Sequence, residues 1–557
     1  MTLRIAPQPK GDIELTDAEN HLCTLLDECT TYLKEEHGIT TACRINGGWV
    51  RDKLLGSQSN DIDISLTDMM GAPFAEHFVS FLSERDHLGD SEVKIAKIGS
   101  NPDQSKHLET ARTTLFGIDL DFVNLRSEEY AENSRIPTEV KFGTPLQDAM
   151  RRDITINSLF YNVHSRTVED QTGKGLDDLR SGTIRTPLAP LETFRDDPLR
   201  VIRCIRFASR FGFEMDLELQ NAARDPIIQE ALSLKISRER VGEELDKMMK
   251  GPDPLRSIQL ISDLSLYQSI YYIPPEIAAI RSAPPQPFYL SVTAAHILHD
   301  LLSPSPPDLP PLHPTLLSHA LAEPGIKARL FFAASVYPFT GTTYLKKKRN
   351  TSMVEAAICE GLKLGSKNHY SDGIPALFAA AELLQNLDLK SSNFKSPSER
   401  VAIGLLLREK VVHNPNSGSH WATSLLFSLV CELVHVQNGS YALVVEDQGN
   451  CIERYNAFTR RVEELGLDSA VDAKPILNGH EVTKALNAKP GPWAQTILNN
   501  VMKWQLDHPS GTKEECLIWL KAEQDAGRVN LDDLNPISPG SKRVQVADKA
   551  SAKKAKR

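Results

Sequence analysis

Cysteine pairs and long apolar runs are both lacking in this sequence. The eight cysteines among 557 residues are scattered without a CxxC pair, which argues against a zinc site or a disulfide framework and favours a reducing compartment. No apolar run approaches the roughly 20 residues that cross a bilayer, so no membrane-spanning segment is expected. Residues 1–10 lack the apolar core of a secretory signal.

An excess of positive charge is lacking as well. The formal net charge is −10, which is unfavourable for a general nucleic-acid binder, so any contact with RNA must come from local basic surface. An apolar content of 41% and a charged content of 24% are ordinary for a globular protein. The length exceeds what one hydrophobic core supports and indicates three or four packed units.

Strand and helix patterns divide the chain into two regions. Residues 15–34 have the spacing of an amphipathic helix, with Thr16 as its N-cap. Residues 62–66 and 118–125 alternate apolar and polar positions, as strands do. From Leu146 onward helical spacing dominates. The sequence therefore predicts a small N-terminal α/β head followed by a long helical body.

Three segments show neither pattern clearly. Residues 67–114 form a long polar stretch between the predicted strands. Residues 282–314 are dense in proline and are predicted to be an irregular loop. The residues from Pro536 onward are polar and basic and are predicted to be disordered.

The first candidate site combines two glycines with paired carboxylates. Gly47 and Gly48 let the backbone approach a ligand closely, and their N–H groups can cradle phosphate. Arg51 can add a charge-assisted bond to that phosphate. Asp61 and Asp63 are two residues apart, so on a strand they face the same side. Paired hard carboxylates suit Mg²⁺, which works together with substrate phosphates.

A second acidic strand follows the first. Asp119 and Asp121 repeat the alternation, and one of them could complete a two-metal site. In the alternative interpretation the glycines form a turn and the aspartates a solvated strand face; a glycine pair next to two acidic strands makes this less probable than for one Asp-x-Asp pair alone. A Walker-type ATPase is disfavoured, because residues 172–175 lack the preceding glycine of that loop.

Paired arginines open the helical region. Arg151 and Arg152 stand beside Asp153, and Asn157 follows one turn later. Such a group could bind a triphosphate and ribose hydroxyls. A helix start with surface charges is the alternative, and this motif alone does not decide between them.

A basic helix begins beside Asp197. Pro198 fits the first helical position, so Asp197 could be a simple N-cap. Spacings of three and four place several of the following arginines on one helical face: Arg200, Arg203, Arg206 and Arg210. An Asp three residues before an Arg also offers one acceptor and a fork of donors. That set matches the edges of cytosine and adenine, whereas uracil and guanine present the reverse polarity, so the pair could select C and A without a nucleic-acid template.

Five motifs in this order resemble the class II tRNA nucleotidyltransferase and bacterial poly(A) polymerase family, which belongs to the polymerase-β-like superfamily. Residues 47–52 with Asp61 and Asp63 look like motif A, and residues 151–157 match motif B position by position. The remaining resemblances are residues 170–179 to motif C, 196–200 to motif D and 236–245 to motif E. Motif D normally begins with Glu, where this chain has the shorter Asp196.

The resemblance implies an enzyme that adds CCA to the 3′ end of tRNA from CTP and ATP by a two-metal mechanism. It implies Asp61, Asp63 and Asp121 as catalytic residues, with Asp61 and Asp63 holding Mg²⁺. Segment 67–114 resembles the flexible loop that helps such a pocket switch from C to A. The implied nucleotide-binding residues are Gly47, Gly48, Arg51, Asp52, Arg152, Asp153, Asn157, Asp197, Arg200 and Arg203.

The fold implied by the resemblance is α+β. Residues 475–479 and 488–492 are similar to the tail signature that grips the tRNA elbow, which makes Lys489 and Gly491 implied tRNA contacts; two turns rich in Gly and Pro are the alternative. The expected domains are a polymerase-β-like mixed-sheet nucleotidyltransferase head (1–165), an all-α neck (166–280), a helical body (281–410), a helical tail (411–535) and a disordered basic tail (536–557).

Three alternatives stay open: an enzyme that adds only CC or only A, a poly(A) polymerase of the same superfamily, and a non-catalytic RNA-binding protein on the same fold. The pair Asp197 and Arg200 favours C and A over A alone. The expected partners are the tRNA 3′ end and elbow, CTP and ATP, with no membrane and no obligate protein partner. The expected location is the cytoplasm, with the nucleus and the mitochondrion as further candidates.

Overall fold

The structure, a computed structural model, describes residues 9–85, 95–98, 110–130, 137–303, 309–439 and 444–529. The chain divides into two compact units, Met1–Gln385 with Pro415–Glu453, and Asn386–Asn414 with Arg454–Arg557. Residues 86–94 and 99–109 of the expected flexible loop, residues 304–308 of the proline-rich segment and the whole expected basic tail lie outside the described residues.

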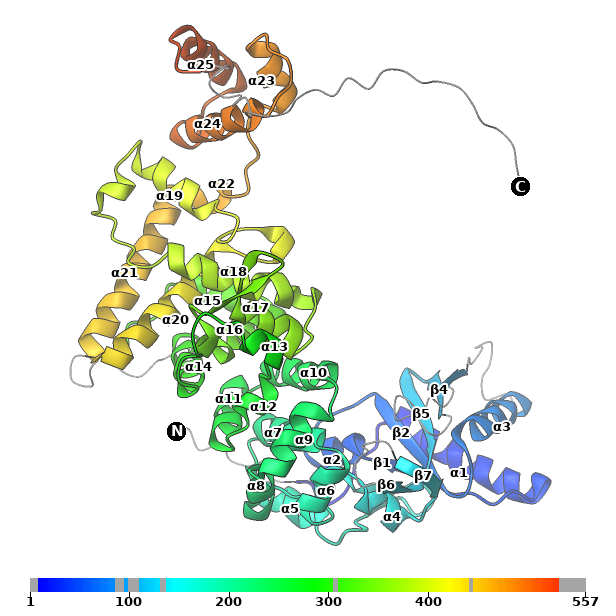
Figure 1. Ribbon diagram of the computed structural model, residues 1–557. Helices are drawn as coiled ribbons and strands as arrows, with labels where there is room; N and C mark the ends of the chain where they lie inside the picture. Colours follow the sequence, from blue (N-terminus) through cyan, green and yellow to red (C-terminus); the bar gives the residue numbers. More distant parts are fainter. Residues whose placement is uncertain are drawn as a thin grey trace, which may run out of the picture. The chain divides into compact units, whose positions relative to one another are not determined.

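A mixed sheet of seven described strands forms the N-terminal part of the first unit (Figure 1). β2 and β5 run parallel, and the other neighbouring strands are antiparallel. The predicted strands at 62–66 and 118–125 are confirmed as β2 and β5, which lie side by side in the middle of the sheet. The spatial order is β3 (Ala96–Ile98), β4 (Thr110–Leu115), β5 (Ile118–Asn124), β2 (Asp61–Leu66), β1 (Cys43–Asn46), β8 (Phe160–Asn162) and β9 (Thr167–Glu169).

Helices α1 (Asp17–His37) and α3 (Gly71–Glu84) pack on each other and on the sheet. Thr16 caps α1 through a capping box with Glu19, which confirms the predicted N-cap. A Cβ on Gly71 would lie 2.0 Å from the carbonyl oxygen of Phe122 on β5. Glycine therefore lets α3 begin directly against the strand that carries Asp121.

Part of segment 67–114 is regular structure, and the expectation of a flexible loop was wrong for these residues. α3 occupies residues 71–84, and β3 and the start of β4 fill residues 96–98 and 110–114. The rings of Phe74 and Phe78 pack against Phe122 with centroid distances of 5.3 and 5.9 Å. The helix forms because apolar side chains four residues apart share one face, a spacing that the polar neighbours obscured.

The rest of the first unit is mainly helical, which confirms the α+β fold class (Figure 1). Three short strand pairs accompany the helices: β6 (Arg126–Tyr130) with β7 (Pro137–Phe142), β10 (Thr183–Ile184) with β11 (Glu214–Met215), and β12 (Thr343–Lys346) with β13 (Arg349–Ser352). The helices are α2 (Gly48–Leu54), α4 (Pro145–Met150), α5 (Gly175–Ser181), α6 (Pro190–Asp196), α7 (Leu199–Phe211), α8 (Leu217–Ala223), α9 (Pro226–Leu234), α10 (Arg238–Met249), α11 (Pro254–Asp263), α12 (Tyr267–Ile270), α13 (Pro275–Ala278), α14 (Tyr289–Leu301), α15 (Pro314–Leu321), α16 (Pro324–Ser335), α17 (Met353–Ala356), α18 (Tyr370–Leu383) and α20 (Trp421–Gly439).

The proline-rich segment 282–314 is likewise not a continuous irregular loop. Helix α14 occupies residues 289–301 and buries Leu290, Leu298 and Leu301. The prolines of the segment lie before and after this helix. The expectation failed because the overall proline content of the segment conceals a proline-free stretch long enough for three helical turns.

The second unit contains α19 (Glu399–Leu407), α22 (Leu467–Ala470), α23 (Gly479–Ala485), α24 (Trp493–Asp507) and α25 (Lys513–Asp525), and the boundary between the units falls within α21 (Val444–Glu464). Its last three helices share a small core around Leu477, Trp493 and Leu520. In the part of the chain that the structure describes, no helix is both long and apolar enough to span a bilayer.

Candidate active site

Carboxylates from two parallel strands meet on one side of the sheet. β2 carries Asp61 and Asp63, and β5 carries Asp119 and Asp121. The register sets Asp61 opposite Asp119 and Asp63 opposite Asp121. Because alternate strand residues face the same side, the structure brings together the three carboxylates that the sequence assigned to catalysis.

Arg112 on β4 holds two of these carboxylates. Its Nη2 lies 3.2 Å from Oδ1 of Asp61, and its Nε lies 3.4 Å from Oδ1 of Asp121. Arg112 was not among the residues predicted from the sequence, because only the antiparallel pairing of β4 with β5, which sets Arg112 opposite Asp121, places it there. The guanidinium offsets the repulsion between the gathered negative charges.

The environment of Asp63 and of Asp121 raises the pKa values of these two carboxylates. Protein atoms around Asp63 displace much of its hydration shell, although part of the side chain remains open to solvent, and this raises its pKa to about 6. The charge of Arg152 opposes this rise, and the charges of Asp61 and Asp121 add to it. Burial also raises the pKa of Asp121. A carboxylate with a raised pKa gains stability when a cation binds beside it.

The donor set fits a metal ion that arrives with its substrate. Among the described residues, no three His, Cys, Asp or Glu side chains gather closely enough to hold a metal ion by themselves. Mg²⁺ is commonly bound by one or two carboxylates together with substrate phosphates, rather than by a cage of protein ligands. Asp61 and Asp63, at alternate positions of β2, offer such a pair.

Metal binding is expected to weaken below pH 6. A proton on Asp63, whose pKa is about 6, competes with the ion, so the affinity should fall about tenfold per pH unit below that value and level off above it. The same raised pKa means that the contribution of Asp63 to folding stability is largest at low pH and is lost as the pH rises through about 6. Mn²⁺ titrations followed by electron paramagnetic resonance between pH 4.5 and 8 would measure the pH dependence of the metal affinity. An Asp63→Asn variant that kept the wild-type pH dependence would contradict it.

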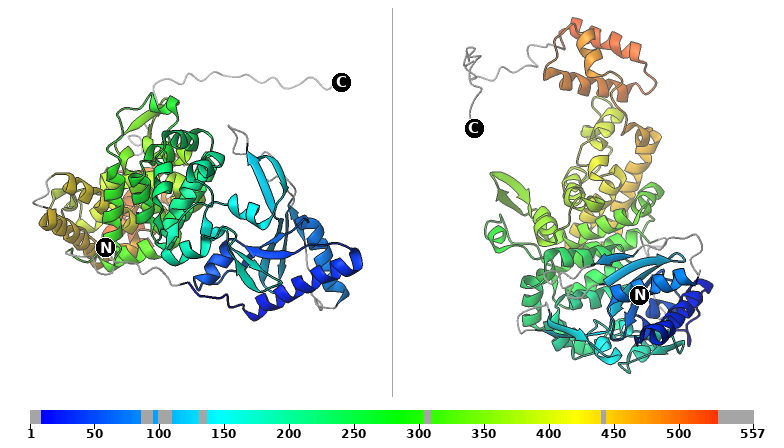
Figure 2. Two further views of the ribbon diagram at one scale, coloured as in Figure 1. Left: turned by 90° about the horizontal axis from the view of Figure 1, so that it is seen from below. Right: turned by 90° about the vertical axis from the view of Figure 1, so that its right-hand side faces the viewer.

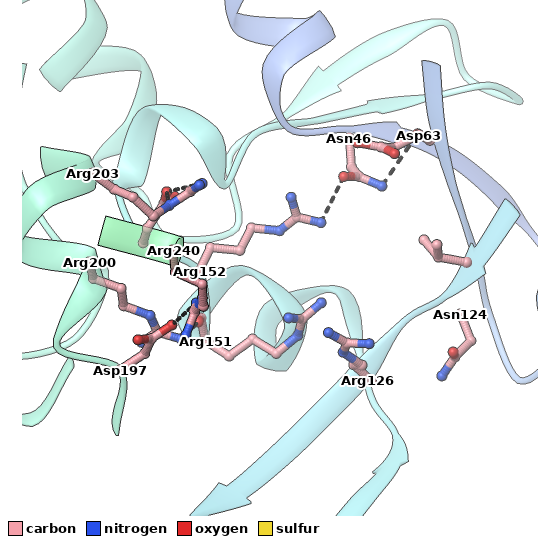
Figure 3. A pocket seen from close by; sticks show the side chains of 12 residues that line it. Asn46, Asp63, Asn124, Arg126, Arg151, Arg152, Asp197, Arg200, Arg203 and Arg240 are labelled. Atoms are coloured by element: carbon pink, nitrogen blue, oxygen red, sulfur yellow. Dashed lines mark hydrogen bonds and ion pairs between the residues drawn. The ribbon is translucent and has the colours of Figure 1, made fainter. Parts of the chain in front are cut away.

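A cationic pocket of about 380 Å³ opens beside the carboxylates (Figure 3). Six arginines against three aspartates give its lining a positive balance, which suits a polyanionic ligand. Six of the predicted site residues line it: Asp63, Arg152, Asp153, Asp197, Arg200 and Arg203. The other lining residues are Asn46, Val123, Asn124, Arg126, Arg151 and Arg240.

The glycine pair starts α2 at the edge of the pocket. Gly47 precedes the helix with φ 71°, and a Cβ there would lie 3.1 Å from Nη1 of Arg152. Any larger residue would thus be strained in its backbone and would press on a pocket arginine. A Cβ on Gly48 would lie 3.4 Å from Nη2 of Arg51, which is ordinary contact.

Arg51 lies away from the pocket, inside the junction of α2 and α7. It is 3% exposed, its guanidinium pairs with Asp52 at 2.7 Å and donates to Oδ1 of Asn157, and its Cζ lies 5.2 and 4.8 Å from the ring centroids of Phe207 and Phe211. A direct bond to phosphate would require Arg51 to leave these partners. In this structure Arg51, Asp52 and Asn157 act together as a brace between the sheet domain and α7.

Asp148 is a buried residue that the sequence analysis overlooked. Its fully buried carboxylate accepts from Arg151 at 2.5 Å and from Nη2 of Arg152 at 2.8 Å, and these two cations lower its pKa to about 2 despite burial. Arg152 also donates to Oδ1 of Asn46 at 2.8 Å, and Asn46 donates to the carbonyl oxygen of Asp63 (Figure 3). The available signal was the position of Asp148 three and four residues before the arginine pair, in the last turn of α4.

Replacing Asp148 with Ala is expected to lower the free energy of unfolding by about 3–5 kcal/mol, because the buried ion pair is broken and two arginines lose their partner. The stabilisation by Asp148 should be fully present at pH values above the ordinary pKa of an aspartate. It should be lost as the pH falls through about 2, the lowered pKa of Asp148. Urea denaturation at pH 7, at pH 3 and at about pH 1.5 would measure both effects. A loss under 1 kcal/mol at pH 7 would contradict the role of Asp148 as the support of Arg151 and Arg152.

Asp153 holds an arginine of α7. Its carboxylate accepts from Nη2 of Arg203 at 2.6 Å and from Nδ2 of Asn157 at 3.1 Å. The charge of Arg203 and these hydrogen bonds keep the pKa of Asp153 well below its usual range despite burial. Asp153 thus orients Arg203, and the predicted direct contact of Asp153 with the nucleotide would require one of these bonds to be exchanged.

Asp197 bonds the start of α7 and also lines the pocket. Its Oδ1 accepts from the backbone N–H of Leu199 at 3.1 Å at the start of α7, while its Oδ2 accepts from Nη2 of Arg240 at 2.8 Å. Its side chain also lines the pocket (Figure 3). The sequence analysis gave no chemistry to residues 236–245, and Arg240 was therefore missed; only the packing of α10 against α7 brings it to Asp197.

Arg200 lies beside Asp197 on the same pocket wall. It is 8% exposed, and its Nη2 donates to the carbonyl oxygen of Arg151 at 2.6 Å, while its Nη1 donates to that of Thr193 at 3.4 Å. Asp197 and Arg200 thus reach the pocket with separate supports. This arrangement leaves acceptor capacity on the carboxylate and donor capacity on the guanidinium.

Lys489 and Gly491 lie in the second unit, in the connection between α23 and α24. The side chain of Lys489 is exposed, and its carbonyl oxygen accepts from Nε1 of Trp493 at 3.2 Å. The carbonyl oxygen of Gly491 accepts from the N–H of Ala494. The loop is therefore ordered by the start of α24, and its lysine is available to a ligand.

Comparison with known proteins finds similarity to tRNA nucleotidyltransferases and to the polymerase domains related to them. Residues 43–185 match the Poly A polymerase head domain family, and residues 214–280 match a family described as the probable RNA and SrmB-binding site of polymerase A. The chain is 38% identical to the mitochondrial CCA tRNA nucleotidyltransferase of Saccharomyces cerevisiae, covering 92% of this chain and 94% of that protein. It is 33% identical to the tRNA nucleotidyltransferase cca1 of Schizosaccharomyces pombe over 90% and 95% of the two chains.

The solved structure of a CCA-adding enzyme in an apo form is similar in fold, with a TM-score of 0.57 and 18% identity over 90% of this chain and 96% of that one. A CCA-adding enzyme in complex with CTP gives a TM-score of 0.55 at 18% identity over 91% and 96% of the two chains. At this identity the likeness concerns the fold, and it extends over the helical regions as well as the sheet.

Proposed function

The chain belongs to the CCA tRNA nucleotidyltransferase family, and on this basis we propose that it adds CCA to the 3′ end of tRNA from CTP and ATP without a nucleic-acid template. One observation carries the proposal most directly. A cationic pocket that contains Asp197 and Arg200 adjoins two strands that carry Asp61, Asp63 and Asp121. The residues proposed to select the base and those proposed to bind metal thus lie at one site.

Nucleotidyltransferases of this kind generally use divalent metal ions, and we propose that Asp61 and Asp63 hold Mg²⁺ with support from Asp121. Bound Mg²⁺ would lower the pKa of the tRNA 3′-hydroxyl and stabilise the charge on the departing pyrophosphate. Arg112 contributes by holding Asp61 and Asp121 in ion pairs, so that carboxylates which repel one another stay close together.

We propose that the pocket arginines orient the triphosphate. Arg152 is fixed by Asp148 and Asn46, and Arg203 is fixed by Asp153. Cations that are held before the substrate arrives lose little freedom on binding, and they place the α-phosphate for in-line attack. Gly47 leaves the space that Arg152 needs.

Base selection follows from the polarity of Asp197 and Arg200. Cytosine and adenine each present an amino donor beside a ring acceptor, which suits a carboxylate next to a guanidinium. Uracil and guanine present an acceptor beside a donor. Their acceptor would therefore face the carboxylate, which also accepts, and their donor would face the guanidinium, which also donates. Arg240 positions Asp197 through its second oxygen.

The division into head, neck, body and tail, and the contact of Lys489 and Gly491 with the tRNA elbow, are proposed on the motif resemblance. The S. cerevisiae relative is named as mitochondrial, so the mitochondrion is the compartment that the comparison favours, with the cytoplasm and the nucleus as further candidates.

The test is to incubate the purified protein with tRNA that ends at the discriminator base, with each NTP alone and then with CTP and ATP together. Addition of two residues with CTP and of three with both nucleotides is the expected result. Two residues both with CTP alone and with CTP and ATP together would indicate a CC-adding enzyme. Extension only of tRNA that already ends in CC would indicate an A-adding enzyme, and a long adenosine tail a poly(A) polymerase. No extension would favour a non-catalytic RNA-binding protein.

A further inference from the structure

A basic β-hairpin projects from the helical part of the first unit (Figure 2). β12 and β13 pair from Thr343 opposite Ser352 to Lys346 opposite Arg349, which leaves Lys347 and Lys348 as a two-residue turn. The tip is thus the run Lys346-Lys347-Lys348-Arg349. This run played no part in the sequence analysis, because only the hairpin concentrates its four cations at one projecting point.

The turn has a backbone conformation that lysine does not favour. Lys347 has φ 49° and Lys348 has φ 68°, as in the two-residue turns where Asn and Gly are strongly preferred. Residues held in sparsely populated backbone conformations cluster at functional sites. Here both disfavoured residues are lysines.

The cations of the tip face solvent with little neutralisation. All four side chains are exposed, and Lys346 lies 3.3 Å from Glu360. Among the residues that the structure describes, Lys347, Lys348 and Arg349 have no carboxylate partner within ion-pair distance. Three of the four cations, with Glu355, line a shallow groove of about 370 Å³ along the hairpin. A protein of net charge −10 thus concentrates unpaired positive charge at one point.

A second basic surface in the same unit differs from the hairpin tip, because its positive charges are paired. Its cations, from the ends of α7 and α10, are each paired with a carboxylate: Arg206 with Glu244, Arg210 with Asp52, Lys247 with Glu244 and Lys250 with Asp246. That surface is largely neutralised, so the hairpin is the stronger candidate for binding a polyanion.

The base of the hairpin is held firmly. Tyr344 is buried, the N–H of Ser282 donates to the carbonyl oxygen of Thr343 at 2.8 Å, and the N–H of Thr343 donates to Oγ of Ser282 at 3.0 Å. The tip therefore presents its charges from an anchored support, and binding costs less conformational entropy than it would for a flexible basic tail.

We propose that the hairpin tip, Lys346 to Arg349, binds the phosphate backbone of the tRNA substrate. The proposal rests on the proposed function, since tRNA is the polyanion that the enzyme must hold away from its catalytic pocket. Exposed lysine and arginine side chains bind RNA phosphates by releasing condensed counterions, which makes the affinity depend on salt.

The test replaces the turn by one that the backbone prefers, with Lys347→Asn and Lys348→Gly in the full-length protein. If the lysines contact phosphates, tRNA affinity should fall about 3- to 10-fold at 100 mM KCl, and the slope of log K against log[KCl] should become shallower by about 1–2. The thermal midpoint should not fall, because Asn-Gly suits this turn better. Fluorescence anisotropy with labelled tRNA measures the affinity.

Two controls separate charge from shape and position. The Lys347→Arg/Lys348→Arg variant keeps both charges and should retain the wild-type salt slope. The Lys34→Asn/Lys235→Asn variant removes two charges from exposed sites on α1 and after α9 and should leave the slope unchanged. An unchanged affinity and slope in the Asn-Gly variant, or an equal loss in the Arg variant, would overturn the proposal.

The proposed function is tested separately in the same preparation. At saturating tRNA, single-turnover incorporation of CTP should be the same in the Asn-Gly variant and in the wild type, because the tip is not in the pocket. If the wild-type protein bound tRNA with the expected salt dependence but added no nucleotide, the proposed activity would be rejected, whereas the proposal that the hairpin tip binds tRNA would stand.

Discussion

The Asp61→Ala/Asp63→Ala variant is expected to lose nucleotide transfer by at least about 1,000-fold. Two-metal stabilisation of the transition state supplies several kcal/mol, and a loss of about 4 kcal/mol corresponds to that factor. The fold should survive, because Asp61 is a largely exposed residue and the removed carboxylates repel each other. Single-turnover CTP incorporation, with tRNA affinity and thermal midpoint measured in parallel, tests this.

Asp119 provides a matched control for that experiment. It lies opposite Asp61 on the neighbouring strand and accepts a hydrogen bond from Oγ1 of Thr114 at 2.7 Å. Asp119→Ala therefore removes an acidic residue from the same sheet surface without touching the proposed metal ligands, and its activity should stay within about tenfold of the wild type. Near-normal transfer by the double variant would remove the two-metal assignment, whereas equal losses in all variants would point to the general charge of the surface.

Base choice should change most when Arg200 is replaced by Ala. The variant leaves the ring acceptor of the bound base without its donor in a partly closed pocket, at a cost of about 1–3 kcal/mol. The preference for CTP over UTP should consequently fall about 10- to 100-fold. Binding of metal and tRNA should change far less, because Arg200 contacts the carbonyl oxygens of Arg151 and Thr193 and not the carboxylates of β2.

Asp197→Asn separates base selection from helix capping. The amide oxygen can still accept from the N–H of Leu199, so the cap on α7 is kept, while the amide nitrogen replaces the acceptor that faces Arg240. We expect the ratio of CTP to UTP incorporation to fall with little change in the melting temperature. Arg195→Ala, at an exposed position of α6, is the control and should leave the ratio unchanged. An unchanged ratio in Asp197→Asn with unchanged stability would reduce Asp197 to a capping residue.

The sequence alone predicted those features that depend on local spacing. The alternation at Asp61 and Asp63 and at Asp119 and Asp121 predicted two acidic strands, and Thr16 was predicted as the N-cap of the first helix; the structure confirms these elements. Local patterns succeed here because strand alternation and helix caps are determined by residues close in the chain. Where composition was averaged over a long segment, as in 67–114 and 282–314, the helices α3 and α14 were missed.

Only the tertiary structure decided how the chemical groups support one another. Arg112 reaches Asp61 and Asp121 through strand pairing, and Arg240 reaches Asp197 because α10 packs on α7. The same packing buries Arg51 between Asn157 and two phenylalanine rings. Apart from Arg112 and Asp121, which are nine positions apart on neighbouring strands, these contacts join residues tens to more than a hundred positions apart, and no local pattern specifies such pairs. The sequence thus determined which residue types gather for catalysis, whereas burial and charge pairing determined which of them face the pocket and which hold the others in place.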